Sequence, residues 1–525
     1  MTKARVANVK EKAATRGKKV KTWPPPGGSI DEIAGLLTEG VRRIGAGYHA
    51  GEFRQKLAVR TMALGLFDRA AEALDGSVGW AAAWDPWWSA YARGEVVVTA
   101  LVGRIAGAAA LTEAQRGVLR RWLVEGEAAL ADIGPTWTAC RPQALLGAGW
   151  LLLGEQARGD RLLAAAVAGV DPESNTTEHR AVIAHAYAAL GRVREAIEVL
   201  TSREAVSWTY AAPAVAEVVR RASADELERL RSRLAGVGAH REFVLFDRGL
   251  ARLIALKEWA AAKSWLAGFE GLATRDGEAQ LIAAMVAAGE ATWIEASRSL
   301  VDPQQSRGVE VLLALARVSP DLARGHLERR FADAPALLVR AANVGQHLRA
   351  LAGAAARCGR LDVAERVEAL GRDAGEMQAA RLGVLAELDP SDAAWAAWFS
   401  RARPGATSEE KAELAALAVR AGSPDAAALL DEAIAAARAS IFPDDALEQL
   451  SGRLVGVGDM TAAHRVWLTI AKGKRPNRSR PLLAGCVAAE AWAGALELLR
   501  AMPQDLGAPQ RASQLLLGLA DGEGL

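Results

Sequence analysis

Histidine, the side chain that most often serves as a catalytic base or a metal ligand, is scarce and scattered in this chain. Among the seven histidines, only His179 and His185 lie close together. A spacing of six places them on different faces of a helix, whereas two metal ligands on one helix need a spacing of four. Gly45-Ala46-Gly47 lacks the lysine and serine that complete a phosphate-binding loop, and no His-Glu-x-x-His motif occurs. The sequence therefore predicts a protein that is not an enzyme and holds neither a metal nor a cofactor.

The three cysteines give no chemical site either. Cys140, Cys358 and Cys486 lie far apart, each within a helical pattern. Such spacing fits neither a metal site nor a disulfide framework. We expect all three to be small buried hydrophobic residues.

Tryptophan is unusually common, with 16 residues against 8 phenylalanines and 4 tyrosines. Asp85-Pro86 is a capping residue followed by a proline suited to the first position of a helix, so the aromatic residues around it should be divided between two helices. They form either a buried seam, because aromatics dominate core packing, or a partly open pocket for a partner's apolar side chain. The residues concerned are Trp80, Trp84, Trp87, Trp88 and Tyr91.

Positive charge is concentrated in two places. Residues 1–21 carry eight basic side chains and one acidic one, a balance of 8 − 1 = +7, which leaves 2 − 7 = −5 for the rest of the chain. Three prolines in residues 23–28 then favour an extended spacer, so residues 1–28 are predicted to form a flexible basic arm. The second cluster lies in a loop without a local acidic residue, and it is either solvated charge or a contact for phosphates or an acidic protein. Its members are Lys472, Lys474, Arg475, Arg478 and Arg480.

The elements that carry these residues are predicted to be helices. Alanine, leucine, arginine and glutamate are strong helix formers, and alternation of the strand type is scarce. A chain of 525 residues is also too long for one compact core, which usually stops growing at about 250 to 300 residues. The class expected is therefore all-α with a modular architecture.

A turn recurs along most of the chain. It is clearest at Gly191, where one apolar helix stops and another begins. From Gly191 to Glu490 nine intervals cover 490 − 191 = 299 residues, about 33 each, which is the period of stacked helix pairs. This period predicts a right-handed α-solenoid of stacked antiparallel helix hairpins. The later breaks lie near Ser223, Lys257, Gly289, Ser319, Gly359, Pro390, Gly422, Gly458 and Glu490.

The organisation before residue 177 is less regular. Ser29 with Glu32, and Thr112 with Gln115, have the spacing of a capping box at a helix start. We expect irregular helical hairpins over residues 29–176 and the regular solenoid over residues 177–525. Loops at residues 169–176 and 401–407 are the best internal boundaries.

The stretch 177–200 resembles a tetratricopeptide repeat. Tyr187, Gly191, Ala196 and Leu200 match the aromatic, turn, small and large positions of that repeat. A small residue at the crossing lets two helices approach closely. The sequence departs from the repeat at Arg180, and the units around Gly359 and Gly458 are weaker copies, so other α-solenoids of the HEAT or pentatricopeptide kind remain open.

The resemblance implies that the first helix of each pair lines a concave groove that binds a peptide or a helix of a partner. The alternative is that the side chains there are ordinary solvated surface residues. Those that would face the groove are Glu178, His185 and Arg192 in one repeat and Gln346, Arg349 and Arg357 in another.

These patterns predict a cytoplasmic, non-catalytic scaffold or adaptor for protein–protein interaction. The longest uncharged apolar stretch, residues 144–154, is far short of the roughly 20 residues that span a bilayer, so no membrane span is expected. The alternative is a nucleic-acid-associated protein that contacts phosphates through the basic arm and residues 472–480. Self-association by end-to-end stacking is also open, because residues 515–519 are apolar.

Overall fold

The computed structural model describes residues 23–25, 27–42, 48–75, 85–102, 111–134, 137–170, 177–202, 208–234, 239–269, 274–296, 308–338, 343–471 and 474–500. In these ranges the regular structure is helical, without a strand. The chain divides into two compact units: a shorter one with residues 1–33 and 408–508, and a longer one with residues 34–407. The boundary after Thr407 falls at the end of the loop 401–407, while the three-part division proposed from the sequence stays a prediction.

Helix α2 (Ile30–Arg42) begins in the shorter unit and continues into the longer one. The other helices of the longer unit are α3 (Tyr48–Ala63), α4 (Phe67–Asp75), α5 (Pro86–Val102), α6 (Glu113–Ile133), η1 (Trp137–Ala139), α7 (Cys140–Leu152), α8 (Gln156–Ala168), α9 (Thr177–Ala189), α10 (Val193–Leu200), α11 (Trp208–Arg221), α12 (Ala224–Leu234), α13 (Ala239–Ala255), α14 (Trp259–Gly268), α15 (Thr274–Ala287), η2 (Ala291–Ala296), α17 (Gly308–Val318), α18 (Pro320–Leu338), α19 (Val344–Arg357), α20 (Leu361–Glu368), α21 (Ala374–Glu387) and α22 (Ala393–Ala402). Those of the shorter unit are α23 (Ser408–Arg420), α24 (Ala426–Arg438), α25 (Pro443–Gly456), α26 (Met460–Trp467), η3 (Arg475–Arg478), α27 (Arg480–Ala488) and α28 (Trp492–Arg500).

The hairpins close with one recurring backbone turn. Gly191 has φ +75°, its amide donates to the carbonyl of Ala188 at 2.9 Å, and the amide of Arg192 donates to the carbonyl of Tyr187 at 2.9 Å. This is the Schellman arrangement, in which a residue in the left-handed region satisfies the last carbonyls of a helix. The next helix starts within two residues, so the turn reverses the chain and produces an antiparallel pair.

The predicted period is confirmed by the same geometry. Of the predicted breaks after Gly191, six have a positive φ: Lys257, Gly289, Gly359, Gly422, Gly458 and Glu490. The breaks at Ser223, Ser319 and Pro390 are also junctions between helices. The described chain is thus an α-solenoid of stacked helix hairpins, as expected.

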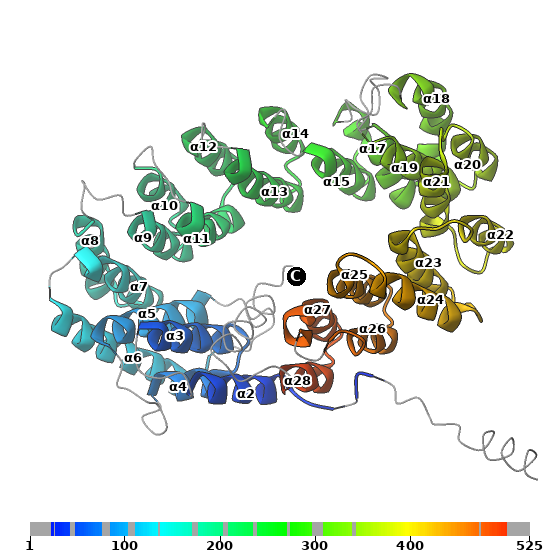
Figure 1. Ribbon diagram of the computed structural model, residues 1–525. Helices are drawn as coiled ribbons and strands as arrows, with labels where there is room; N and C mark the ends of the chain where they lie inside the picture. Colours follow the sequence, from blue (N-terminus) through cyan, green and yellow to red (C-terminus); the bar gives the residue numbers. More distant parts are fainter. Residues whose placement is uncertain are drawn as a thin grey trace, which may run out of the picture. The chain divides into compact units, whose positions relative to one another are not determined.

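The helices of the longer unit form two layers. We call α3, α5, α7, α9, α11, α13, α15, α17, α19 and α21 the first helices, and the helices that follow them the second helices. Each first helix packs against the first helix of the next hairpin, whereas most second helices pack mainly on their own hairpin. Figure 1 shows α9, α11, α13 and α15 in one row and α10, α12 and α14 in the other.

The first helices approach to backbone contact where a glycine faces a neighbour. A Cβ added to Gly383 of α21 would lie 2.1 Å from the carbonyl oxygen of Arg349 on α19. Real Cβ atoms do not come so close, so any larger residue would force α19 and α21 apart. This contact fixes the spacing of α19 and α21.

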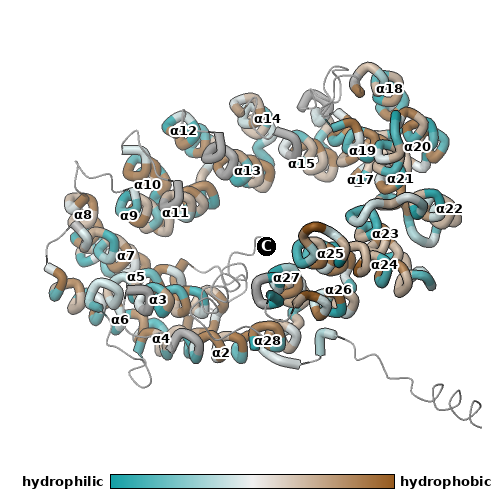
Figure 2. Tube along the Cα trace, in the orientation of Figure 1, coloured by the Kyte–Doolittle hydropathy of each residue, from teal (hydrophilic) through white to brown (hydrophobic). Residues whose placement is uncertain are grey.

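The core follows the amphipathic pattern of the helices, with hydrophobic and hydrophilic residues alternating along each one (Figure 2). Ala196 and Leu200, the small and large positions of the tetratricopeptide-like unit, are fully buried. The excess of tryptophan serves mostly this core, since Trp122 and Trp265 are 0% and 2% exposed. All three cysteines are free and buried, as expected.

The local start signals also behave as predicted. Thr112 and Gln115 form a complete capping box at the start of α6. The amide of Glu32 donates to Ser29 Oγ at 3.1 Å at the start of α2, which gives one half of that box. Pro86 is the first residue of α5, and the amide of Trp87 donates to Asp85 Oδ1 at 2.8 Å.

Candidate functional site

Three of the five clustered aromatic residues lie together on α5. The Trp87 and Tyr91 rings are stacked with centroids 5.0 Å apart, and Trp88 meets both edge-on, at 4.8 Å from Trp87 and 6.0 Å from Tyr91. Trp88 is buried at 7% exposure, whereas Trp87 and Tyr91 are half-buried. Trp80 and Trp84 lie outside the described residues. The described part of the cluster therefore combines a core residue with two partly accessible rings.

Arg141 of α7 connects this aromatic group to the predicted groove. Its guanidinium carbon lies 4.5 Å from the Trp87 centroid and 5.8 Å from the Tyr91 centroid. The same guanidinium pairs with the carboxylate of Glu178 on α9. The positive charge is thus held between aromatic faces and a carboxylate, an arrangement that stabilises a partly desolvated arginine. We call Trp87, Trp88, Tyr91, Arg141 and Glu178 the Arg141 cluster.

The position of the cluster follows from where its residues stand in their helices. Trp87, Arg141 and Glu178 are each the second residue of a first helix, in α5, α7 and α9. Consecutive first helices pack side by side, so equivalent positions are brought next to one another. The Arg141 cluster therefore marks the edge of the first-helix layer at which these helices begin.

Burial perturbs the acid–base groups beside the cluster. The pKa of His179 is lowered to about 4 by desolvation, with a further contribution from the charge of Arg141. Desolvation also raises the pKa of the Cys140 thiol to about 11. At neutral pH His179 is uncharged and Cys140 is a thiol, so neither is poised for base or nucleophile chemistry.

The other two predicted groove residues of this repeat lie further along the hairpin, and Arg192 is not on the first helix, contrary to the prediction, because α9 ends at Ala189. His185 is half-buried, and its charge acts on Glu217 of α11. Arg192 lies at the turn, where its guanidinium carbon is 4.8 Å from the Tyr187 centroid and its Nε donates to Glu195 at 3.0 Å. The three residues are therefore spread along the hairpin, and only Glu178 belongs to the Arg141 cluster.

The predicted groove residues of α19 form a second accessible group. Gln346 and Arg357 are exposed, and Arg349 is half-buried beside the close contact with Gly383. Nearby, Arg317 of α17 donates from Nε to Glu387 of α21 at 3.0 Å, so an ion pair joins the first helices on either side of α19. Polar side chains on three consecutive first helices are thus positioned by the packed layer.

The basic loop has acidic neighbours that its local sequence does not show, because helix stacking places them beside it. Lys474 pairs with Asp444 at 2.8 Å, and Arg478 pairs with Glu448 at 2.7 Å and with Asp445. Asp444 and Asp445 belong to the first turn of α25, where the hydrogen bond from Lys474 lowers the pKa of Asp444.

The remaining basic residues of the loop have different surroundings. Arg475 donates from Nε to the carbonyl of Ile470 at 2.9 Å and lies 5.6 Å from the Trp467 centroid. Arg480 is exposed at the start of α27, and Lys472 lies outside the described residues. Contact of this loop with phosphates stays a prediction.

The spacer expected at residues 23–28 is a packed segment, not a free one. Trp23 is only 7% exposed, and its ring is stacked on that of His464 of α26 with centroids 4.3 Å apart. Its indole Nε1–H donates to Glu497 of α28 at 2.9 Å. We call residues 23–28 the Trp23 segment, of which Pro26 is not described. Prolines and glycines exclude a helix there, but they suit an extended chain lying across two helices.

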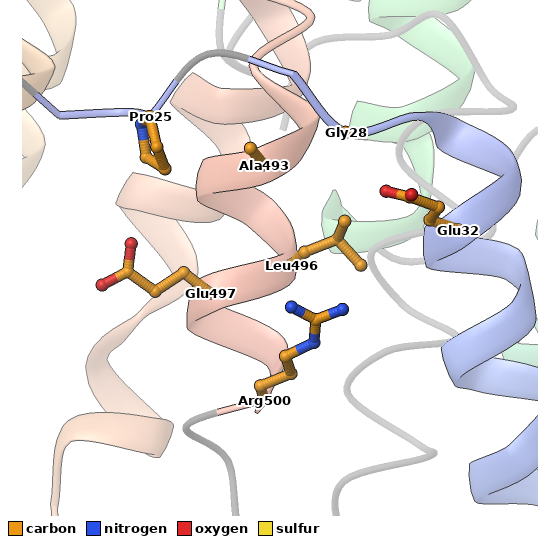
Figure 3. Close-up of a pocket in the computed structure, with 7 residues that line it drawn as sticks. All are labelled: Pro25, Gly28, Glu32, Ala493, Leu496, Glu497 and Arg500. Carbon is orange, nitrogen blue, oxygen red and sulfur yellow. The ribbon is translucent and has the colours of Figure 1, made fainter.

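A pocket lies where this segment crosses α28 (Figure 3). It has a volume of about 450 Å³. Pro25, Ala493 and Leu496 supply apolar surface, while Glu32 and Arg500 are exposed at its rim. Gly28 and Glu497 complete the lining.

The described ranges contain neither a cluster of metal-ligating side chains nor a helix of membrane-spanning character. No group of three or more histidine, cysteine, aspartate or glutamate side chains there is placed to hold a metal ion. None of the helices described is long and apolar enough to cross a bilayer.

Two features of the site have little or no signal in the sequence. Arg141 has no distinguishing pattern, and only the stacking of α5, α7 and α9 gives it its role. The partners of Trp23, Thr461 and Glu497, lie 438 and 474 positions away. The isolated tryptophan before a proline run was the one hint that the segment is anchored.

No model of a known protein family matches this chain, and no curated protein matches it. Among solved structures, one described as "Structure of Naa15/Naa10 bound to HypK-THB" aligns over 94% of this chain and 78% of that chain, with 12% identity and a TM-score of 0.31. Another, described as "Circular tandem repeat protein with novel repeat topology and enhanced subunit contact surfaces", covers 94% of this chain and 98% of that chain, with 14% identity and a TM-score of 0.13.

Proposed function

We propose that this protein is a non-catalytic scaffold or adaptor that binds a peptide or helix of a partner protein along its layer of first helices. The observation that carries the proposal is the rigid spacing of that layer. At the crossing of α19 and α21 the backbones are in contact, and Gln346 and Arg357 are exposed on α19. The cytoplasm is the location that we expect for it.

A rigid layer lowers the entropic cost of binding. In a solenoid each hairpin is held by its neighbours, so its side chains have little freedom left to lose when a partner arrives. Arg357 is exposed and provides positive charge near the end of α19, whereas Arg317 of α17 is already paired with Glu387. We therefore expect the partner segment to bring acidic side chains to this part of the layer.

The Arg141 cluster would provide a second contact. Trp87 and Tyr91 are half-buried, and aromatic residues of this kind are frequent at energetically important interface positions. Their rings are pre-oriented by stacking and by Arg141, so a partner's apolar side chain would meet a fixed surface.

Site-specific photocrosslinking in lysate of the native cell tests this proposal. A photoreactive residue replaces Gln346 or Arg357 on the first helix α19, and Arg329 on the second helix α18 serves as the matched exposed control. We expect one partner to be crosslinked from both α19 positions and not from position 329. Arg349→Glu should reduce the yield, because it reverses a charge within the layer.

Equal crosslinking from α18 and α19, or none from α19 while position 329 reacts, would contradict binding along the first helices. Crosslinks that vanish after nuclease treatment would favour the second function.

That second function is contact with nucleic-acid phosphates through residues 1–28 and 472–480. It is favoured by the excess of seven positive charges in residues 1–21. The acidic neighbours of Lys474 and Arg478 weaken the share of the loop in it.

A further inference from the structure

The Trp23 segment occupies a surface that has the features of a peptide-binding site. The Trp23 ring is stacked on that of His464 and its indole N–H donates to Glu497, so the side chain is recognised by both packing and hydrogen bonding. The ring of Trp467 also stacks on that of His464, with the two centroids 5.5 Å apart. Aromatic grooves of this kind accept extended proline-rich chains.

The main chain of the segment is recognised at both ends. The amide of Trp23 donates to Thr461 Oγ1 at 3.1 Å, and the same hydroxyl donates to the carbonyl of Trp23 at 2.7 Å. At the other end the amide of Ala493 donates to the carbonyl of Gly27 at 3.0 Å. Contacts to backbone at two points fix the register of an extended chain independently of the side chains between them.

The surface of α28 is shaped to receive the prolines. A Cβ added to Gly494 would lie 2.6 Å from Pro24 Cβ and 3.3 Å from the Trp23 ring. Only glycine at this position leaves room for the segment. In contrast, a Cβ on Gly452 of α25 would meet nothing closer than 3.5 Å.

The segment is joined to α2 by a hinge of two glycines. Gly27 and Gly28 have φ of +93° and +83°, in the region that other residues rarely adopt. Release of the segment requires Gly27 to lose the hydrogen bond from Ala493 and Gly28 to leave the backbone of α28, where an added Cβ would lie 2.5 Å from the Ala493 nitrogen. The two glycines supply the backbone freedom for that movement, so rotation at this pair can separate the segment from α28.

We propose that the surface of α26 and α28 is a recognition site for an extended Trp-Pro peptide, which the resting chain fills with its own residues 23–28 and which accepts the same segment from a second copy. The exchanged pair makes the same contacts as the closed chain, so exchange needs no new interface. The closed form dominates in the intact protein, because a tethered ligand has a high effective concentration. The site lies in the shorter unit, so it is independent of the scaffold surface proposed above.

Two full-length variants separate the ligand from its site. Trp23→Ala removes the anchoring ring and leaves the site intact. Gly494→Ala keeps the ring and blocks the site, and alanine is a better helix former than glycine. Each variant alone should sediment as wild type does. A mixture, with one variant fluorescently labelled, should give a new species of twice the mass, because the released segment of Gly494→Ala enters the vacant site of Trp23→Ala.

The control mixture pairs Trp23→Ala with Gly452→Ala, whose own segment stays in place, and should give no mixed species. A labelled peptide of residues 21–28 provides a second readout. It should bind Trp23→Ala at least about tenfold more tightly than wild type, where the tethered segment competes, and it should not bind Gly494→Ala. A peptide with alanine in place of tryptophan should bind none of them.

Failure of the peptide to bind Trp23→Ala, with its helical circular dichroism intact, would overturn the recognition site. Peptide binding without a mixed species would show that the site does not accept the Trp23 segment of a second copy. If Trp23→Ala does not fold, Trp23→Phe takes its place, since it keeps a ring to stack and loses the hydrogen bond to Glu497.

Discussion

At the scale of single residues, Arg141 joins two parts of the predicted site. The aromatic group on α5 and the groove residue Glu178 on α9 were separate features of the sequence. Arg141 contacts Trp87 and Glu178 together, so substitutions in either group act on one cluster. A double-mutant cycle between Trp87 and Glu178 is therefore expected to show coupling although the two side chains stand on different helices.

Buried His179 makes the stability of the longer unit depend on pH. Its folded pKa of about 4 lies below the ordinary value of 6.5, mainly because burial disfavours the charged ring and also because Arg141 is close. The unfolded chain therefore binds the proton first on acidification. The stabilising contribution is complete above pH 6.5 and is lost as the pH falls towards 4.

We expect the denaturation midpoint to fall between pH 6.5 and 4, and His179→Gln to flatten this dependence. Thermal unfolding followed by circular dichroism at a series of pH values measures it. Val182→Ala, at a half-buried position of the same helix, is the control, because it removes no titratable group and should retain the wild-type slope. Identical slopes for the two variants would refute the role of His179.

At the scale of helices, the turns show which features local chemistry controls. Lys257 and Glu490 adopt φ of +58° and +52°, although neither is glycine. Each closes its hairpin with the same pair of backbone hydrogen bonds as Gly191. The hairpin period therefore depends on where apolar helices stop, and glycine at the turn is favourable rather than required.

The contact between α19 and α21 predicts one large and one small effect of adding a methyl group. Gly383→Ala would place its Cβ against the carbonyl of Arg349 and should lower the free energy of unfolding by about 1–3 kcal/mol or more. Gly345→Ala on α19, where the nearest atom would be 3.5 Å away, should be neutral or slightly stabilising. Urea denaturation of the two variants measures the difference. Equal midpoints would show that the layer is not fixed by this contact.

At the scale of the whole molecule, charge is partitioned between a basic N-terminal stretch and a remainder of net −5. Helix stacking neutralises part of the second basic cluster by placing Lys474 and Arg478 beside the acidic start of α25. Any attraction to a polyanion should therefore come mainly from residues 1–21. We therefore expect a structural role for Lys474 and Arg478 and an electrostatic role for residues 1–21.

If the protein binds nucleic acid, the salt dependence of binding should identify the contacts. Replacing Lys18 and Lys19 by glutamine should reduce the slope of log K against log salt by up to about 2, one for each lost phosphate contact. Arg478→Ala should leave that slope unchanged and lower stability instead, because it removes the ion pairs to α25. Fluorescence anisotropy with labelled duplex DNA measures the slope. A slope that falls equally in both variants would restore the loop as a phosphate contact.

The sequence was enough to predict the helices, the hairpin period, the turn positions, the cap at Thr112 and the burial of the cysteines. Five of the six predicted groove residues do lie on first helices, whereas Arg192 lies at the turn before α10. The sequence could not show that Glu178 is paired or that Arg349 lies against a neighbouring backbone. Residues 23–28 were predicted to be a free spacer. Proline and glycine exclude a helix there, but they do not determine whether an extended chain is free or bound.

The sequence by itself determined whatever depends on a few consecutive residues, because helix propensity, apolar spacing and turn closure are set within about one hairpin. Only the tertiary structure decided which side chains meet across hairpins. The contacts of Arg141 with Trp87, of Lys474 with Asp444 and of Trp23 with Glu497 depend on how the helices stack. Stacking angles follow from the combined packing of many side chains, and no short segment of sequence contains that information.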